Sequence, residues 1–113
     1  DIGALLTRSK LIISRSGANT VWDLAALAKP AILIPLPIAA GDEQTKNARI
    51  LETAGSAIII SQKDLSRQTL KEAIAKINEN LPDFEKNAKA FQKTLPQNSA
   101  EKLIQYITST LNP

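Results

Sequence analysis

Three short runs of apolar, mostly β-branched residues mark the first half of the chain, at residues 11–14, 31–35 and 57–61. Each run is nearly continuous instead of alternating, which predicts buried parallel strands in a sheet covered on both faces. The stretches between them, 20–28 and 43–54, have helical composition and lengths that suit right-handed crossovers. The order βαβαβ therefore predicts an α/β fold, a Rossmann-like parallel sheet with flanking helices.

After the third run the apolar pattern changes to a helical period. Ser66 is placed to cap a helix whose apolar stripe consists of Leu70, Ala73, Ile74, Ile77 and Leu81. Pro82 can begin another helix, with an apolar side of Phe84, Ala88, Phe91 and Leu95 and a favourably spaced pair, Glu85 and Lys89. A last helix is expected after Pro96, with the stripe Ala100, Leu103, Ile104, Ile107 and Leu111. We divide the chain accordingly into a βαβαβ core, 1–61, and a helical segment, 62–113.

Composition and charge exclude several classes of function. With 113 residues, 43% of them hydrophobic and 22% charged, the chain suits one globular domain at most. The absence of Cys, His and Met removes disulfides, thiol or histidine catalysis, and Cys or His metal sites. The net charge of +3 comes without a dense basic run, so we expect no nucleic-acid partner. No apolar run approaches the roughly 20 residues that span a bilayer, and no signal peptide is recognisable.

Two features lead us to expect further sequence upstream. The chain begins with Asp1 instead of Met, inside a stretch of helical composition. Three strands also make a thin parallel sheet, so we expect preceding residues to supply others.

Residues 11–20 carry the strongest functional signal, since a buried strand runs directly into a small-residue turn that opens a helix. N–H groups at a helix start lack intrahelical partners, and the helix dipole adds partial positive charge. This turn predicts a phosphate site that Gly17 allows a ligand to approach closely. Its donors would be the main chain of Ala18, Asn19 and Thr20, a hydroxyl of Ser16 or Thr20, and the charge of Arg15. The alternative is simple capping by Asn19 or Thr20, with Asp23 reaching back.

Asp23 and Trp22 lie near the start of the same predicted helix. Ligands of open α/β sheets collect at this edge, and the two carboxylate oxygens of Asp23 suit a sugar diol. Capping or plain solvation is the commoner fate of such an Asp. Trp22 could stack on a base, although packing is the commoner role of a single Trp.

A second polar corner follows the second strand. Pro35 and Pro37 stiffen a loop, and Asp42 can cap a new helix whose dipole Glu43 complements. Gln44 and Asn47 share one face of that helix, and their neutral carboxamides can recognise sugar hydroxyls, unless they are ordinary exposed amides. Because consecutive parallel strands deliver their following loops to one edge, we expect both corners to meet in one cleft.

Taken in order, the segments RSGANTVWDLAALAKPAILIPLP and GDEQTKNARILETAGSAIII resemble the C-terminal domain of the MurG family, glycosyltransferases of the family 28 type. Members of this family transfer N-acetylglucosamine from UDP-GlcNAc to undecaprenyl-diphospho-muramoylpentapeptide, which converts lipid I to lipid II in peptidoglycan synthesis. The resemblance runs from about residue 2 to residue 61 and fades beyond.

The resemblance implies the C-terminal, donor-binding part of an inverting GT-B enzyme. It implies that UDP-GlcNAc contacts Ser16, Gly17, Ala18, Asn19, Thr20, Val21, Trp22, Asp23, Gln44 and Asn47. The helix start would face the diphosphate, Asp23 the ribose, and Gln44 with Asn47 the sugar ring. The family commonly has Glu at position 23 and Asp at position 10, where this chain has the shorter Asp23 and Lys10. No metal, cofactor or catalytic residue is implied for this chain.

The same resemblance places the glycine-rich motif, the uracil-contacting loop and the acceptor-binding domain before Asp1. We therefore expect the isolated chain to be inactive, the lipid-linked acceptor to bind through the missing N-terminal domain, and the membrane to be contacted only through the missing parts. The full-length protein is expected to be a peripheral enzyme on the cytoplasmic face of the cell membrane, with roles in cell-wall biogenesis, cell shape and cell division.

Other functions remain open at this point. The chain could be a non-catalytic nucleotide-sugar-binding subunit that docks on a membrane partner through Leu103, Ile104, Ile107 and Leu111. It could belong to a related lipid glycosyltransferase that uses another sugar. A receiver-like or flavodoxin-like regulatory domain would need clustered acids at strand ends or a phosphate loop after the first strand, and only isolated acids are present.

Overall fold

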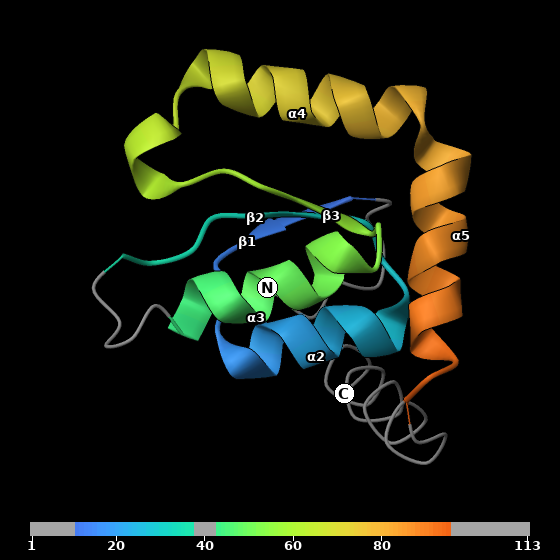
Figure 1. The fold of residues 1–113 in the computed structure, drawn as a ribbon. Coiled ribbons are helices and arrows are strands. Elements are labelled where there is room, and N and C mark those ends of the chain that lie inside the picture. The colour runs from blue at the N-terminus through green and yellow to red at the C-terminus, as the bar shows by residue number, and fades with distance from the viewer. Residues whose placement is uncertain (1–10, 38–42, 96–113) are drawn as a thin grey trace, which may run out of the picture.

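The computed structural model describes residues 11–37 and 43–95. Three parallel strands form its sheet in the order β1-β2-β3: β1 (Ile12–Ser14), β2 (Ala31–Leu33) and β3 (Ala57–Ile59). Helix α2 (Ala18–Leu27) joins β1 to β2, and α3 (Glu43–Thr53) joins β2 to β3. Both crossover helices lie on one face of the sheet, and α4 (Arg67–Glu79) lies on the other (Figure 1). The predicted α/β fold and its βαβαβ order are confirmed.

The strands are shorter than the predicted runs, although their ladder extends a little further. The Ile34 N–H donates to the Ser14 carbonyl at 2.9 Å, and the Ile60 N–H donates to the Leu33 carbonyl at 3.0 Å. Pro35 has no N–H to donate, so the pairing of β2 ends before it. The apolar run therefore continues past the regular strand because burial, and not only pairing, selects its residues.

Two apolar layers, one on each face of the sheet, make up the core. Val21, Leu24 and Leu51 pack with β-strand residues on the side of α2 and α3, whereas Ile32, Ile60 and Ile77 pack on the side of α4. All three residues of β2 are fully buried, which is why the central run is continuously hydrophobic.

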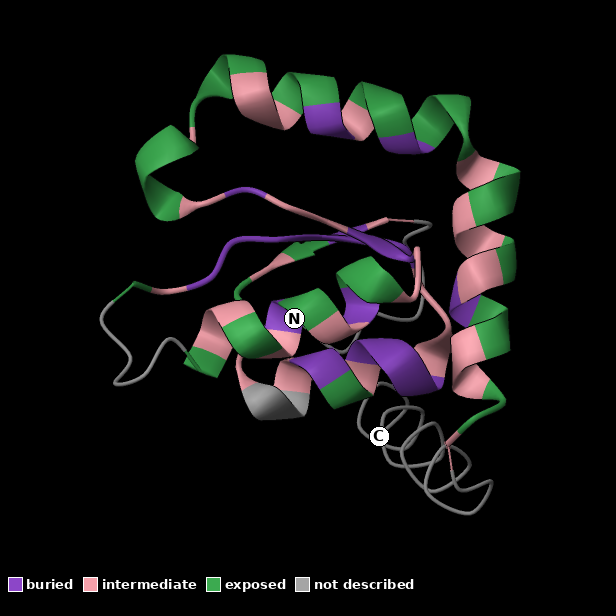
Figure 2. Cartoon of the chain, viewed as in Figure 1, coloured by how far each residue is buried: buried purple, intermediate pink, exposed green. Residues whose placement is uncertain are grey.

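Helix α4 begins where the sequence predicted. It follows a short 3₁₀ helix, η2 (Gln62–Asp64). Ser66 Oγ accepts from the Thr69 N–H at 3.1 Å, and Thr69 Oγ1 accepts from the Ser66 N–H at 2.9 Å, which completes a capping box. The predicted stripe faces the sheet, with Ala73 and Ile77 buried and the outer face exposed (Figure 2).

Helix α5 (Leu81–Gln92), with Pro82 in its first turn, stands across the ends of both layers (Figure 1). Asn87 Nδ2 donates to the Gly55 carbonyl at 3.1 Å, and Gln92 Nε2 donates to the Ala26 carbonyl at 2.6 Å. Gly55 has φ of +81°, and a Cβ there would lie 2.5 Å from Asn87 Nδ2. Helix α5 thus holds α2 and α3 near their C-terminal ends.

Some expectations fall on other parts of the chain. The helix after Pro96, the capping role of Asp42 and the position of Lys10 lie outside the described residues.

Candidate functional site

The two polar corners meet at the carboxyl edge of the sheet. Ser16 is fully buried in the turn between β1 and α2, and its hydroxyl donates to the Gln44 carbonyl in α3 at 2.7 Å. Asn47 Nδ2 lies 3.4 Å from the Ser16 carbonyl, to which it donates. The starts of α2 and α3 are therefore tied together through Ser16, and the expectation that the two corners share one edge is confirmed.

Helix α2 begins earlier than predicted, and this changes the capping assignment. Its N-cap is Gly17, which makes no side-chain cap hydrogen bond, and the first helical bond runs from the Val21 N–H to the Gly17 carbonyl at 3.0 Å. The alternative in which Asn19 or Thr20 caps the helix, with Asp23 reaching back, is wrong because both residues lie inside the first turn. The N–H groups ahead of Val21 have no helical acceptor, as an anion site requires.

Gly17 borders space that no residue of 11–37 or 43–95 fills. Its φ of −60° and ψ of 158° are accessible to any L-residue, and a Cβ built there would meet none of these residues within 4 Å. Neither backbone strain nor packing against the described residues therefore requires glycine at this position.

Val21 and Trp22 make their contacts with other parts of the fold. The Val21 side chain is fully buried in the core and its N–H is used within the helix, so neither is available to a ligand. Residue Trp22 is 46% exposed, and its ring stacks on Phe91 of α5, with 6.5 Å between ring centroids and 15° between planes. The structure thus gives Trp22 the packing role. For Ala18 and Asn19 only the main chain is described.

Gln44 and Asn47 are half-buried and bind main chain, so they are not ordinary exposed amides. Gln44 Oε1 accepts from the Leu36 N–H at 2.8 Å, which fixes the loop after β2 against the start of α3. Between described residues, the hydrogen bonds of the two side chains occupy Gln44 Oε1 and Asn47 Nδ2. Each carboxamide retains hydrogen-bonding capacity on its other atom.

Asp23 is partly exposed on α2. Its partial burial raises the pKa of the carboxyl above the ordinary value of 3.8. A partly desolvated carboxylate that accepts hydrogen bonds from a diol would recover some of that cost.

The Arg15 side chain makes hydrogen bonds that the sequence did not predict. Its guanidinium donates to the Ile34 carbonyl at 3.4 Å and to Gln62 Oε1, far along the chain. The side chain therefore links the ends of β1, β2 and β3, and its charge is directed to the strand ends instead of the start of α2.

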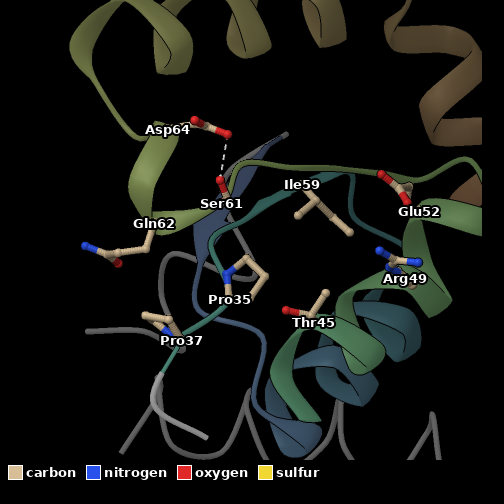
Figure 3. Close-up of a pocket in the computed structure, with 9 residues that line it drawn as sticks. All are labelled: Pro35, Pro37, Thr45, Arg49, Glu52, Ile59, Ser61, Gln62 and Asp64. Atoms are coloured by element: carbon tan, nitrogen blue, oxygen red, sulfur yellow. Dashed lines mark hydrogen bonds between the residues drawn. The ribbon is translucent and has the colours of Figure 1, made fainter. Parts of the chain in front are cut away.

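A cavity of about 370 Å³, here called the α3 pocket, lies beside this corner (Figure 3). Its lining combines the loop after β2, the outer side of α3 and the residues after β3: Pro35, Pro37, Thr45, Arg49, Glu52, Ile59, Ser61, Gln62 and Asp64. No sequence pattern predicted this pocket, although Thr45, Arg49 and Glu52 recur at the spacing of one helix face.

Residues 11–37 and 43–95 contain no group of three or more carboxylate side chains placed to hold a metal ion. In the same ranges, no helix combines the length and the hydropathy needed to cross a bilayer.

Comparison with known proteins gives consistent matches. Residues 1–106 match the family described as "Glycosyltransferase family 28 C-terminal domain". A UDP-N-acetylglucosamine–N-acetylmuramyl-(pentapeptide) pyrophosphoryl-undecaprenol N-acetylglucosamine transferase from Lactococcus lactis is 39% identical over 99 residues, 88% of this chain and 28% of that protein. The enzyme of the same name from Caulobacter vibrioides is 37% identical over 110 residues, 97% of this chain and 30% of that protein.

A solved structure agrees with these matches. The crystal structure of MurG from Acinetobacter baumannii superposes with a TM-score of 0.74 at 28% identity, over 96% of this chain and 31% of that one. The chain thus spans less than a third of the length of these relatives.

Replacing Ser16 by Ala should loosen the start of α3. The variant leaves the Gln44 carbonyl without its buried donor, so we expect a loss of about 1–2 kcal/mol in the free energy of unfolding. Hydrogen exchange should accelerate at the Leu36 amide and the first bonded amides of α3.

Ser56→Ala is the matched control, because Ser56 is also buried and donates to a main-chain carbonyl, that of Leu51, at the other end of α3. It should accelerate exchange there and leave Leu36 protected. Equal exchange at Leu36 in both variants would contradict the role of Ser16.

Asp23→Asn should stabilise the folded chain near neutral pH. Because the folded-state pKa of Asp23 lies above the unfolded value, stability from this group is lost as pH rises through the folded pKa. The asparagine variant does not titrate, so its advantage should shrink as pH falls toward 3.8. Urea unfolding of both proteins across this range measures the difference, and an advantage that grows on acidification would refute the assignment.

Proposed function

We propose, since the chain belongs to the family of glycosyltransferase family 28 C-terminal domains, that it binds the sugar donor of a transferase acting in peptidoglycan synthesis. The donor is UDP-GlcNAc, and the acceptor is the lipid-linked muramyl pentapeptide. The observation that carries the proposal is the pair of hydrogen bonds through Ser16, which hold the starts of α2 and α3 at one edge.

The start of α2 is suited to the diphosphate. Its unpaired N–H groups and dipole favour negative charge, and the open space beside Gly17 lets phosphate oxygens approach the main chain. As the bond from sugar to diphosphate breaks, negative charge grows on the departing oxygen, and fixed donors at this helix start stabilise it. This is the part of the chemistry that the chain supplies.

The start of α3 is suited to the sugar ring. Gln44 Nε2 and Asn47 Oδ1 provide neutral donor and acceptor groups for ring hydroxyls, while their other atoms keep the loop and the turn in place. Asp23 takes the ribose diol. The general base for the acceptor hydroxyl and the main acceptor contacts come from the remainder of the protein, so the isolated chain binds donor without transferring sugar.

The full-length protein works as a peripheral enzyme at the cytoplasmic face of the membrane, where a water-soluble donor and a lipid-linked acceptor meet. Membrane contact is made by the remainder of the protein.

Titration of the full-length protein with UDP-GlcNAc and with UDP tests the sugar contact. Gln44→Ala should weaken UDP-GlcNAc about five- to tenfold and change UDP less than about twofold, because a hydrogen bond to the sugar is absent from UDP. Gln68→Ala, on the exposed side of α4, should change neither affinity. Equal weakening of both ligands by Gln44→Ala would remove the sugar-binding role.

Gly17→Ala should lower the affinity for UDP-GlcNAc without a large loss of stability. We expect a loss of no more than about 1 kcal/mol in the unfolding free energy, since the added methyl group meets no described residue and only the poorer N-cap preference of Ala acts against it. UDP-GlcNAc affinity should fall at least about tenfold, because that methyl group occupies the approach of the phosphates.

Gly55→Ala should show the opposite behaviour. A positive φ and the contact with Asn87 predict a loss of about 1–3 kcal/mol in stability. Donor affinity should be kept while the protein is folded. An unchanged UDP-GlcNAc affinity in Gly17→Ala would show that the diphosphate binds elsewhere.

A further inference from the structure

The α3 pocket borders the proposed sugar site. Pro35 and Pro37 line it on either side of Leu36, whose N–H is held by Gln44 Oε1, and Thr45 follows Gln44 directly. The pocket and the sugar-binding residues therefore share a loop and a helix start. A molecule that meets the donor sugar at this edge can extend into the pocket.

Charges of both signs line the pocket. Arg49 and Glu52 come from α3, and Asp64 follows β3 on the opposite wall, where its carboxylate accepts from the Ser61 hydroxyl at 2.7 Å (Figure 3). A guanidinium binds a carboxylate with good geometry, and carboxylates bind an ammonium group. This lining fits a zwitterionic ligand better than a polyanion, which two carboxylates would repel.

Main-chain groups also reach this side. The Ile60 N–H points toward β2, where it donates to Leu33. Because such groups alternate along a strand, the N–H and C=O of Ile59 point away from β2, toward the free side of the described sheet. Ile59 lines the pocket, so a peptide main chain lying there would find hydrogen-bonding partners.

We propose that the α3 pocket binds the peptide of the acceptor, with Arg49 holding a peptide carboxylate and Glu52 and Asp64 facing an amine. The inference rests on the proposed function, because the acceptors in the names of the relatives carry a pentapeptide. The cavity of about 370 Å³ falls within the range of about 300–1,000 Å³ usual for small-ligand sites, and it takes a short stretch of polar peptide.

Transfer kinetics of the full-length protein with two acceptors test this assignment. The acceptors are the lipid-linked muramyl pentapeptide and the same lipid-linked sugar without its peptide. Arg49→Gln should raise the KM for the peptide-bearing acceptor about fivefold, with the KM for UDP-GlcNAc unchanged. The peptide-free acceptor should react equally well with variant and wild type. Glu52→Gln should also act only on the peptide-bearing acceptor.

Lys71→Gln is the matched control. Lys71 is an exposed cation on α4, outside the donor-binding helix starts and the pocket lining, so its loss changes the net charge equally without a change in either KM. The inference is overturned if Arg49→Gln behaves like Lys71→Gln, or if it impairs both acceptors equally. Absence of transfer by the wild-type protein with either acceptor would instead overturn the proposed function, and the inference with it.

Discussion

The hydrogen bond from the buried Ser16 hydroxyl to the Gln44 carbonyl is the contact on which the site depends. It joins the turn after β1 to the first turn of α3, two points that the sequence separates by a helix, a strand and a loop. Since Ser16 is fully buried, water has little access to its hydroxyl, and loss of the bond removes a contact that ties α3 to the turn after β1. This hydrogen bond holds the starts of α2 and α3 next to each other, so that one ligand can contact both.

The rest of the fold aligns the strand ends and holds the two helices at the carboxyl edge of the sheet. Parallel pairing aligns Ser14 with Leu33 and Leu33 with Ile59, so all three strands end at one level. At the opposite end, Asn87 and Gln92 of α5 bind carbonyls at the C-terminal ends of α3 and α2. Arg15 spans the strand ends on the ligand side. These contacts hold each crossover helix in position, so its first turn can contact a ligand without rearrangement.

Local patterns predicted the layers but not the long-range contacts. Continuous apolar runs placed the strands because burial on both faces leaves that signature, and Ser66 marked the start of α4 by its capping chemistry. The start of α2 was misplaced because Gly17 serves as N-cap without a side-chain bond, a position that propensity assigns to Asn19 or Thr20. The partners of Arg15 and the α3 pocket depend on tertiary geometry, which brings Gln62 and Asp64 beside residues far earlier in the chain.

We propose above that the first turns of α2 and α3 form one donor site. Hydrogen exchange of the full-length protein, with and without UDP-GlcNAc, tests this proposal. The donor should slow exchange at residues 17–23 and 43–47 together, and both segments should saturate at the same donor concentration. Protection of only one segment, or saturation at two different concentrations, would contradict it.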